Sequence, residues 1–158
     1  MDVRIFMTTE IATFGAGCFW KPQEEFDKIK GVVKTTVGFM GGDVKNPSYE
    51  QVCTNETGHV EVTQIEFDTD QISYEELLEK FWEIHDPTQI DRQGPDIGSQ
   101  YRTVIFYHTG EQKRIAENSL KKHQKDFEGK ITTSIEPATD FYKAEEYHQK
   151  YNEKNKLF

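Results

Sequence analysis

Near the start of this chain, a short apolar strand passes through a turn of small residues directly into a helix. Residues 11–14 favour a strand, and the glycines and alanine of residues 15–17 let the backbone turn freely. A helix is predicted over residues 20–30, because Pro22 is tolerated in a first turn and Gly31 is a plausible residue just past the end. This strand–turn–helix order is the strongest local constraint on the fold.

Cys18 lies at the junction between this turn and the predicted helix. The unpaired N–H groups and the dipole of a helix N-terminus favour a thiolate over a thiol, so the context indicates a reactive cysteine. Phe19 and Trp20 follow directly and could wall an apolar pocket, although two consecutive aromatics are also typical of an ordinary core. By itself the context leaves both interpretations open.

Length and composition predict a single domain over residues 1–158, with residues 1–8 as a flexible N-terminal extension. A net charge of −9 argues against nucleic acid and anionic membranes as partners, because both require clustered positive charge. No apolar run approaches the roughly 18 residues of a membrane span, and no signal peptide is recognisable. With two cysteines, the chain is expected to be cytoplasmic with reduced thiols.

The remaining pattern predicts an α+β fold, a two-layer sandwich with antiparallel strands and helices packed on one face. Further strands are expected over residues 32–39, 60–67, 100–107 and 130–135, and further helices over 73–85 and 109–127. Slipped alternation near Gln64 suggests a bulge in the strand 60–67. The order is a βαββαβ core of ferredoxin-like type, with an extra helix and strand. Two long loops, 40–58 and 88–99, and an irregular C-terminal tail supply surface for a site.

A second set of residues has acid–base chemistry. Glu61 alternates with Val60 and Val62 in a predicted strand, which brings a carboxylate among apolar neighbours. Burial raises a carboxyl pKa, and a protonated glutamic acid is a competent general acid, although a strand glutamate can also simply face solvent. The segment from Asp96 to Tyr101 places an acid and a phenol near the start of another strand.

These residues belong to segments that resemble the peptide methionine sulfoxide reductases of the A type, in the family's order and spacing over essentially the whole chain. The matching segments are Gly17-Cys18-Phe19-Trp20, Gly38-Phe39-Met40-Gly41-Gly42, Asn46-Pro47-Ser48-Tyr49, Thr57-Gly58-His59-Val60-Glu61, Asp86-Pro87-Thr88, Gly98-Ser99-Gln100-Tyr101-Arg102 and Glu146-Tyr147-His148-Gln149.

The resemblance implies a thiol-dependent peptide-methionine (S)-S-oxide reductase that repairs oxidised proteins. Cys18 would attack the sulfoxide sulfur and become a sulfenic acid, and Glu61 would donate a proton to the sulfoxide oxygen. Tyr49 and Tyr101 would hydrogen-bond that oxygen. The substrate-binding residues implied are Phe19 and Trp20, which would hold the methyl group, and Asp96, which would help hold the substrate backbone.

Many relatives carry a further cysteine near the C-terminus that resolves the sulfenic acid, and this chain has none there. Cys53 is the other thiol; its neighbours Val52 and Thr54 suggest that it is packed rather than mobile, and whether it resolves the sulfenic acid stays open. The expected reductant is therefore an external thiol, such as thioredoxin or glutaredoxin with glutathione. No metal or organic cofactor is predicted, and the resemblance favours a monomer.

Two other classes of function are compatible with parts of the pattern. A cysteine-dependent hydrolase or transferase would use Cys18 as nucleophile and His59 or His148 as base, but no residue that would orient either histidine is evident. We expect both histidines to be structural, with His148 pinning the tail over the site. An RNA- or ligand-binding module is disfavoured by the negative charge and by the lack of an exposed aromatic–basic strand.

Overall fold

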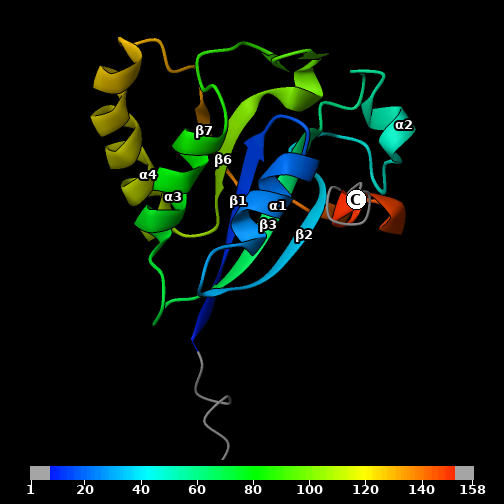
Figure 1. The fold of residues 1–158 in the computed structure, drawn as a ribbon. Helices are drawn as coiled ribbons and strands as arrows, with labels where there is room; N and C mark the ends of the chain where they lie inside the picture. Colours follow the sequence, from blue (N-terminus) through cyan, green and yellow to red (C-terminus); the bar gives the residue numbers. More distant parts are fainter. Residues whose placement is uncertain (1–7, 152–158) are drawn as a thin grey trace, which may run out of the picture.

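A computed structural model describes residues 8–151. All but the last residue of the predicted N-terminal extension, 1–8, therefore lies outside the described part of the chain. A six-stranded sheet forms the centre of the molecule (Figure 1), and its strand order is β7-β6-β1-β3-β2-β8. The strands are β1 (Thr9–Ala16), β2 (Val32–Met40), β3 (Val60–Asp68), β6 (Thr103–Tyr107), β7 (Ser134–Pro137) and β8 (Tyr142–Lys143). Neighbouring strands are antiparallel except β6 and β7, which are parallel.

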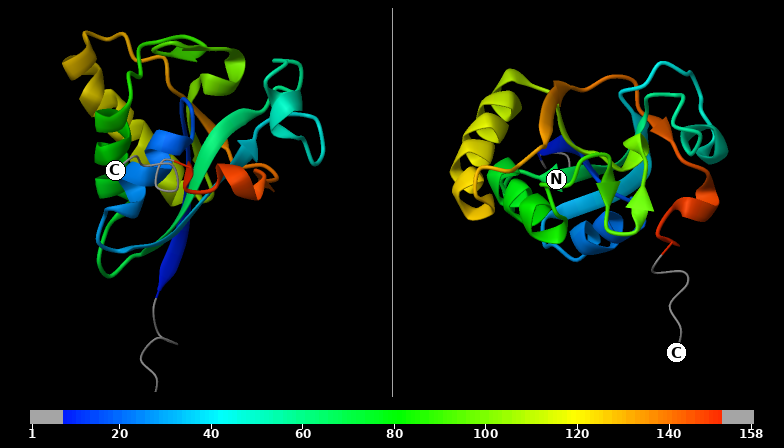
Figure 2. Two further views of the ribbon diagram at one scale, coloured as in Figure 1. Left: turned by 45° about the vertical axis from the view of Figure 1, so that its right-hand side comes forward. Right: turned by 90° about the horizontal axis from the view of Figure 1, so that it is seen from above.

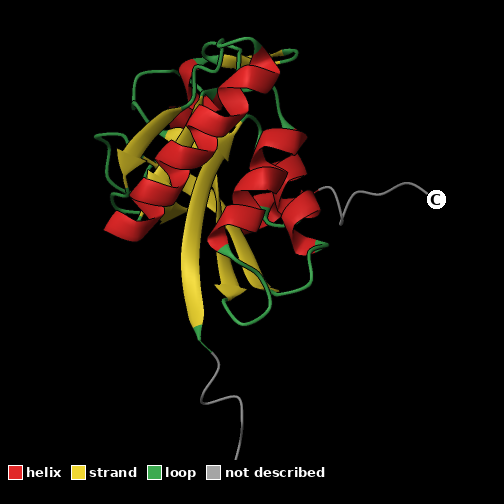
Figure 3. Cartoon of the chain, turned by 90° about the vertical axis from the view of Figure 1, so that its left-hand side faces the viewer, coloured by secondary structure: helices red, strands yellow, loops and turns green. Residues whose placement is uncertain are grey.

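Three helices cover one face of the sheet: α1 (Trp20–Asp27), α3 (Tyr74–Ile84) and α4 (Gly110–His123). Figure 3 shows them in front of the strands, and Figure 2 shows the same arrangement from above. Phe14 of β1 lies at the centre of this core, with its ring centroid 5.1 Å from that of Phe81 on α3. The α+β class with helices on one face of a sheet is confirmed. Within the described residues, no helix is long and apolar enough to cross a membrane.

Strand β3 is buried on both of its faces, which explains the slipped alternation in its sequence. Val60 and Val62 pack with Met40 and Phe106 on the face away from the helices. Ile65 and Phe67, which follow at odd-numbered positions, contribute to the core beneath the helices. The predicted bulge near Gln64 was wrong, because β3 pairs with β1 and β2 without interruption there, and the irregularity lies on β2 at Val33.

Several elements differ from the sequence-based expectation. Helix α1 ends at Asp27 rather than at residue 30, and β7 begins at Ser134 rather than at residue 130. Residues 124–127 continue α4 as a 3-10 turn. The parallel pairing of β7 with β6 also departs from the expected antiparallel sheet, because α4 returns the chain to the same end of the sheet. The tail adds strand β8, which pairs with β2.

Both long loops contain short elements. The first carries α2 (Tyr49–Val52), which begins with a capping box between Ser48 and Gln51. The second carries a hairpin of β4 (Arg92–Gln93) and β5 (Asp96–Ile97), followed by the 3-10 turn η2 (Ser99–Tyr101). All of these elements carry residues of the candidate site, so the loops present functional side chains on ordered backbone.

Candidate active site

Cys18 is half-buried where the chain leaves β1 and enters α1, with Phe19 as the helix N-cap residue. A hydrogen bond from the backbone N–H of Trp20 favours its thiolate, as expected at a helix N-terminus. Burial and the negative charge of Glu61 nevertheless outweigh that contact and raise the pKa of the Cys18 thiol to about 12. The expectation of a thiolate favoured by its surroundings was therefore wrong for the free protein, because the sequence does not show what packs over the turn.

Glu61 is fully buried on β3, opposite Phe39 of β2. Its Oε1 atom accepts a hydrogen bond from the backbone N–H of Phe19 at 3.3 Å, and its Oε2 atom has no hydrogen-bond partner in the described part of the chain. Burial raises the pKa of this carboxyl to about 8, the Phe19 contact opposes the shift, and the charge of Asp96 adds to it. Near neutral pH, Glu61 holds a proton that it can donate.

Two tyrosine hydroxyls lie close to this carboxyl group. Tyr49 opens α2 and Tyr101 closes the turn η2, so the two long loops each supply one phenol. Burial, followed by the charge of Glu61, raises the pKa of Tyr101 to about 12 and that of Tyr49 well above its usual value. The two hydroxyls lie within hydrogen-bond contact of each other. Both phenols therefore remain protonated donors at neutral pH.

A cavity of about 360 Å³ opens beside Cys18. Asp96 lines this cavity from β5, so the structure brings the predicted substrate-binding acid to the same opening as the thiol. Lys21 and Pro22 of α1 also line it. Cys18 thus faces a space that is open to a substrate and is lined by one basic residue, Lys21, and one acidic residue, Asp96.

Gln93 is a site residue that sequence analysis missed. Its carboxamide accepts a hydrogen bond from the backbone N–H of Asp86 at 2.9 Å and donates one to the Asp86 carbonyl at 2.6 Å. Its methylene groups pack against Gly17, whose φ of +87° no other residue adopts easily, so closely that a Cβ atom there would lie 2.6 Å from Cγ. Gln93 therefore holds the hairpin that carries Asp96 against the Cys18 turn.

Phe19 and Trp20 lie in different surroundings although they are adjacent in the sequence. Phe19 is buried, with its ring centroid 5.8 Å from that of Phe39. Trp20 is half-buried, and its indole Nε1–H donates to Nδ1 of His148 at 3.2 Å. The ring of Tyr151 stacks on Trp20 with centroids 3.7 Å apart, a contact that sequence analysis did not foresee.

The tail is fixed against the site by Gln149 as well as by His148. The Gln149 carboxamide accepts a hydrogen bond from the backbone N–H of Val37 at 3.0 Å and donates one to the Val37 carbonyl at 2.9 Å. It thus pairs with the β2 backbone as a residue of a neighbouring strand does. His148 also packs on Tyr49, with ring centroids 4.2 Å apart. The residues 146–151 thus join α1, β2 and α2 at the aromatic side of the site.

Cys53 is exposed rather than packed, contrary to expectation. It lies at the C-terminal end of the one-turn helix α2, which directs it outward, and its sulfur accepts a hydrogen bond from the Tyr49 hydroxyl. Although the residue as a whole is exposed, partial burial of its sulfur raises the pKa of the thiol despite that contact.

His59 lies beside the site but is committed to the loop that precedes it. Its Nδ1 atom accepts from the backbone N–H of Gly42 at 3.0 Å, and its Nε2 atom donates to the Val44 carbonyl at 2.7 Å. Neither ring nitrogen is left to act as a base for Cys18, which weighs against His59 as the base of the hydrolase alternative. Across residues 8–151, no group of three or more histidine, cysteine, aspartate or glutamate side chains has the arrangement of a metal site.

Comparison with known proteins gives the same result from sequence and from structure. A sequence model of the family described as peptide methionine sulfoxide reductase matches residues 10–157. Peptide methionine sulfoxide reductase MsrA of Methanothermobacter thermautotrophicus is 57% identical over 148 residues, which cover 92% of this chain and 88% of that protein. Methionine sulfoxide reductase A of Corynebacterium diphtheriae superposes with a TM-score of 0.88 at 37% identity, covering 93% of this chain and 75% of that one.

The yeast protein Mxr1 in its reduced form is also similar in structure. It superposes with a TM-score of 0.90 at 35% identity, covering 93% of this chain and 86% of the yeast chain. A structure of Mxr1 in complex with Trx2 superposes with a TM-score of 0.66 at 24% identity, covering 90% and 84%.

Proposed function

The chain belongs to the peptide methionine sulfoxide reductase family, and from this membership we propose how its residues carry out the thiol-dependent reduction of methionine S-sulfoxide. The observation that carries the proposal is the buried Glu61, protonated near neutral pH and hydrogen-bonded to the residue that follows Cys18. A soft nucleophile with a proton donor close to it is what the reduction of a sulfoxide requires.

In the first step, the Cys18 sulfur attacks the sulfoxide sulfur while Glu61 donates its proton to the sulfoxide oxygen, and the proton that the Cys18 thiol releases on attack returns to the Glu61 carboxylate. The oxygen passes to Cys18, so the substrate sulfur gains two electrons, the cysteine sulfur loses two, and methionine leaves from a cysteine sulfenic acid. The hydroxyls of Tyr49 and Tyr101 donate hydrogen bonds to the oxygen as charge builds on it. Both remain protonated in this site, which supports the assignment.

We assign substrate binding to three further residues. Phe19 and Trp20 hold the terminal methyl group against their apolar rings, and Asp96, which lines the cavity beside Cys18, holds the substrate backbone. The stacking of Tyr151 on Trp20 supports a fixed orientation of that wall.

An external thiol completes the cycle. It attacks the sulfenic acid of Cys18, water leaves, and a mixed disulfide forms, which a second thiol then cleaves to restore Cys18. The exposed edge of the site and the Trx2 complex of the yeast relative Mxr1 support a thioredoxin-type reductant, with glutaredoxin and glutathione as the alternative. The chemistry as proposed needs no metal or organic cofactor.

Further parts of the proposal concern the whole chain. We assign residues 1–158 to a single reductase domain that acts as a monomer in the cytoplasm, and the free thiols of Cys18 and Cys53 are compatible with a reducing compartment. We also assign the core to the ferredoxin-like class, with support from the order β6-β1-β3-β2 of its central strands.

The proposal is tested with the two epimers of a methionine sulfoxide peptide and dithiothreitol as reductant. The S epimer is expected to be reduced and the R epimer not, because one chiral site fixes the methyl group, the oxygen and the side chain together. Cys18→Ser is the matched control and should abolish turnover of the S epimer. Turnover of the R epimer, or activity that survives Cys18→Ser, would contradict the assignment.

A further inference from the structure

A large cavity lies next to the one beside Cys18 and has no part in the chemistry above. It measures about 740 Å³ and lies between the end of α3 and the 3-10 turn η3 (Gln124–Phe127) that follows α4. Ile84, His85 and Asp86 line both this cavity and the one beside Cys18. A polypeptide with one side chain at Cys18 can therefore place a nearby side chain here.

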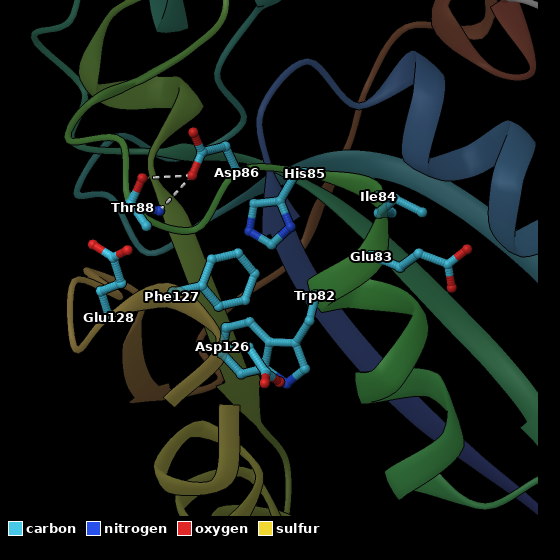
Figure 4. Close-up of a pocket in the computed structure, with 9 residues that line it drawn as sticks. All are labelled: Trp82, Glu83, Ile84, His85, Asp86, Thr88, Asp126, Phe127 and Glu128. Atoms are coloured by element: carbon cyan, nitrogen blue, oxygen red, sulfur yellow. Dashed lines mark hydrogen bonds between the residues drawn. The ribbon is translucent and has the colours of Figure 1, made fainter. Parts of the chain in front are cut away.

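The floor of this cavity is aromatic. Figure 4 shows the ring of Phe127 pointing toward His85 and Trp82, which lie at the centre of the view. His85 donates from Nδ1 to the Phe81 carbonyl, and its Nε2 atom accepts from the Thr103 hydroxyl at 2.8 Å. Because burial lowers the pKa of His85 to about 4, this ring brings no positive charge to the cavity.

The rim of the cavity is negatively charged. Asp86, Asp126 and Glu128 surround the floor, whereas the carboxylate of Glu83 points away from the other lining side chains (Figure 4). Hydrogen bonds from Thr88 hold the pKa of the Asp86 carboxyl below its usual value, so this group is ionised at neutral pH.

The cations near this rim do not neutralise it. Lys130 lies 3.5 Å from Glu128, but both side chains are largely exposed, so the pair contributes little. His123 contacts Asp126 at 3.2 Å but does not line the cavity. No lysine or arginine lines the cavity itself, and its net charge stays negative.

We propose that this cavity is a subsite for a lysine or arginine side chain of the oxidised polypeptide, a few residues from the methionine sulfoxide that Cys18 reduces. An aromatic floor with a carboxylate rim binds the methylene groups and the charged end of such a side chain together. The chain's net charge of −9 attracts a basic peptide over a longer range. The inference rests on the proposed function of Cys18 and adds a sequence preference to it.

The test compares peptides that differ at one position only. Lysine, glutamine or glutamate is placed in turn at each position within about four residues of a methionine S-sulfoxide, which an extended chain spans in about 13–14 Å. Dithiothreitol is the reductant, so a basic surface on a protein reductant cannot produce the effect. At one position, lysine is expected to lower KM about fivefold relative to glutamine, with kcat unchanged. Glutamate at that position is expected to raise KM.

Variants then separate a local subsite from general attraction. Asp126→Asn combined with Glu128→Gln is expected to make kcat/KM for the lysine peptide equal to that for the glutamine peptide at that position. The matched control is Glu111→Gln combined with Glu117→Gln, which changes the net charge equally on the exposed face of α4 and should keep the ratio. A ratio of one in the unchanged enzyme, or equal ratios in both double variants, would overturn the subsite.

The same assays distinguish failure of the subsite from failure of the proposed function. N-acetyl methionine S-sulfoxide amide carries no flanking residue and reports only on the catalytic site of the unchanged enzyme. Its reduction, together with equal KM for lysine and glutamine peptides at every position, would refute the subsite alone. Absence of its reduction would refute the proposed function.

Discussion

The 3.3 Å hydrogen bond from the backbone N–H of Phe19 to Oε1 of Glu61 ties the acid on β3 directly to the turn that carries Cys18. It leaves Oε2 as the unpartnered oxygen of a buried carboxyl group. The same backbone contact that positions the acid also limits how far burial raises its pKa. Acid and nucleophile are therefore positioned by one turn of main chain.

Glu61→Gln is expected to lower turnover of a methionine S-sulfoxide peptide by about 10²–10⁴-fold, because the amide cannot donate the proton. Steady-state rates with dithiothreitol measure the loss. Alkylation of Cys18 by iodoacetamide at alkaline pH is the control for an intact site, and it should be faster in the variant, since the charge of Glu61 raises the pKa of that thiol. Turnover within threefold of the unchanged enzyme would remove Glu61 from the acid role.

The same variant is expected to gain stability relative to the unchanged protein as the pH rises from about 5 to about 8. The folded carboxyl has a pKa raised from 4.5 to about 8, so its contribution to stability is fully present below pH 4.5 and is lost as the pH rises through 8. Glutamine carries no titrating proton. The difference in free energy of unfolding should therefore shift by several kcal/mol, on the order of 5 at most.

Urea denaturation at the two ends of that pH range measures this shift. Glu117→Gln is the matched control, because that carboxylate is exposed on α4 and its replacement should change stability by a similar small amount at both pH values. A pH-independent difference for Glu61→Gln would show that the Glu61 carboxyl titrates normally in the folded protein.

Cys53→Ser is expected to retain turnover with dithiothreitol, because the serine hydroxyl can accept the hydrogen bond that Tyr49 donates to the thiol. After one turnover without reductant, a sulfenic acid on Cys18 should be trapped by dimedone in both proteins and detected by mass spectrometry. Cys18→Ser is the control and should give no adduct. A Cys18–Cys53 disulfide would instead identify Cys53 as a resolving cysteine.

Gly17→Ala is expected to destabilise the protein by about 1–3 kcal/mol more than Gly129→Ala. Both glycines have positive φ, +87° and +74°, but a Cβ atom on Gly17 meets the Gln93 side chain, whereas one on Gly129 has no heavy atom within 4 Å. Thermal unfolding measures the difference, and kcat/KM should fall only for Gly17→Ala. Equal effects would mean that Gln93 does not constrain the turn.

From the sequence, it was easier to name side chains that the structure brings close together than to predict their electrostatics. Glu61 was accessible to prediction because strand alternation places its neighbours Val60 and Val62 in a core. The raised pKa of Cys18 was not, because it depends first on burial and then on the charge of Glu61, both of which arise only when the chain folds. The role of Gln93 could not be predicted either, because it contacts backbone atoms of Asp86 and a glycine without a side chain, Gly17. Such contacts leave no pattern in the sequence.

Trp20 is held by His148, 128 positions further along the chain. During synthesis, the thiol and its acid therefore leave the ribosome long before the residues that fix the aromatic wall. The surroundings of Trp20 are therefore completed last in synthesis, when residues 146–151 reach β2 and α1.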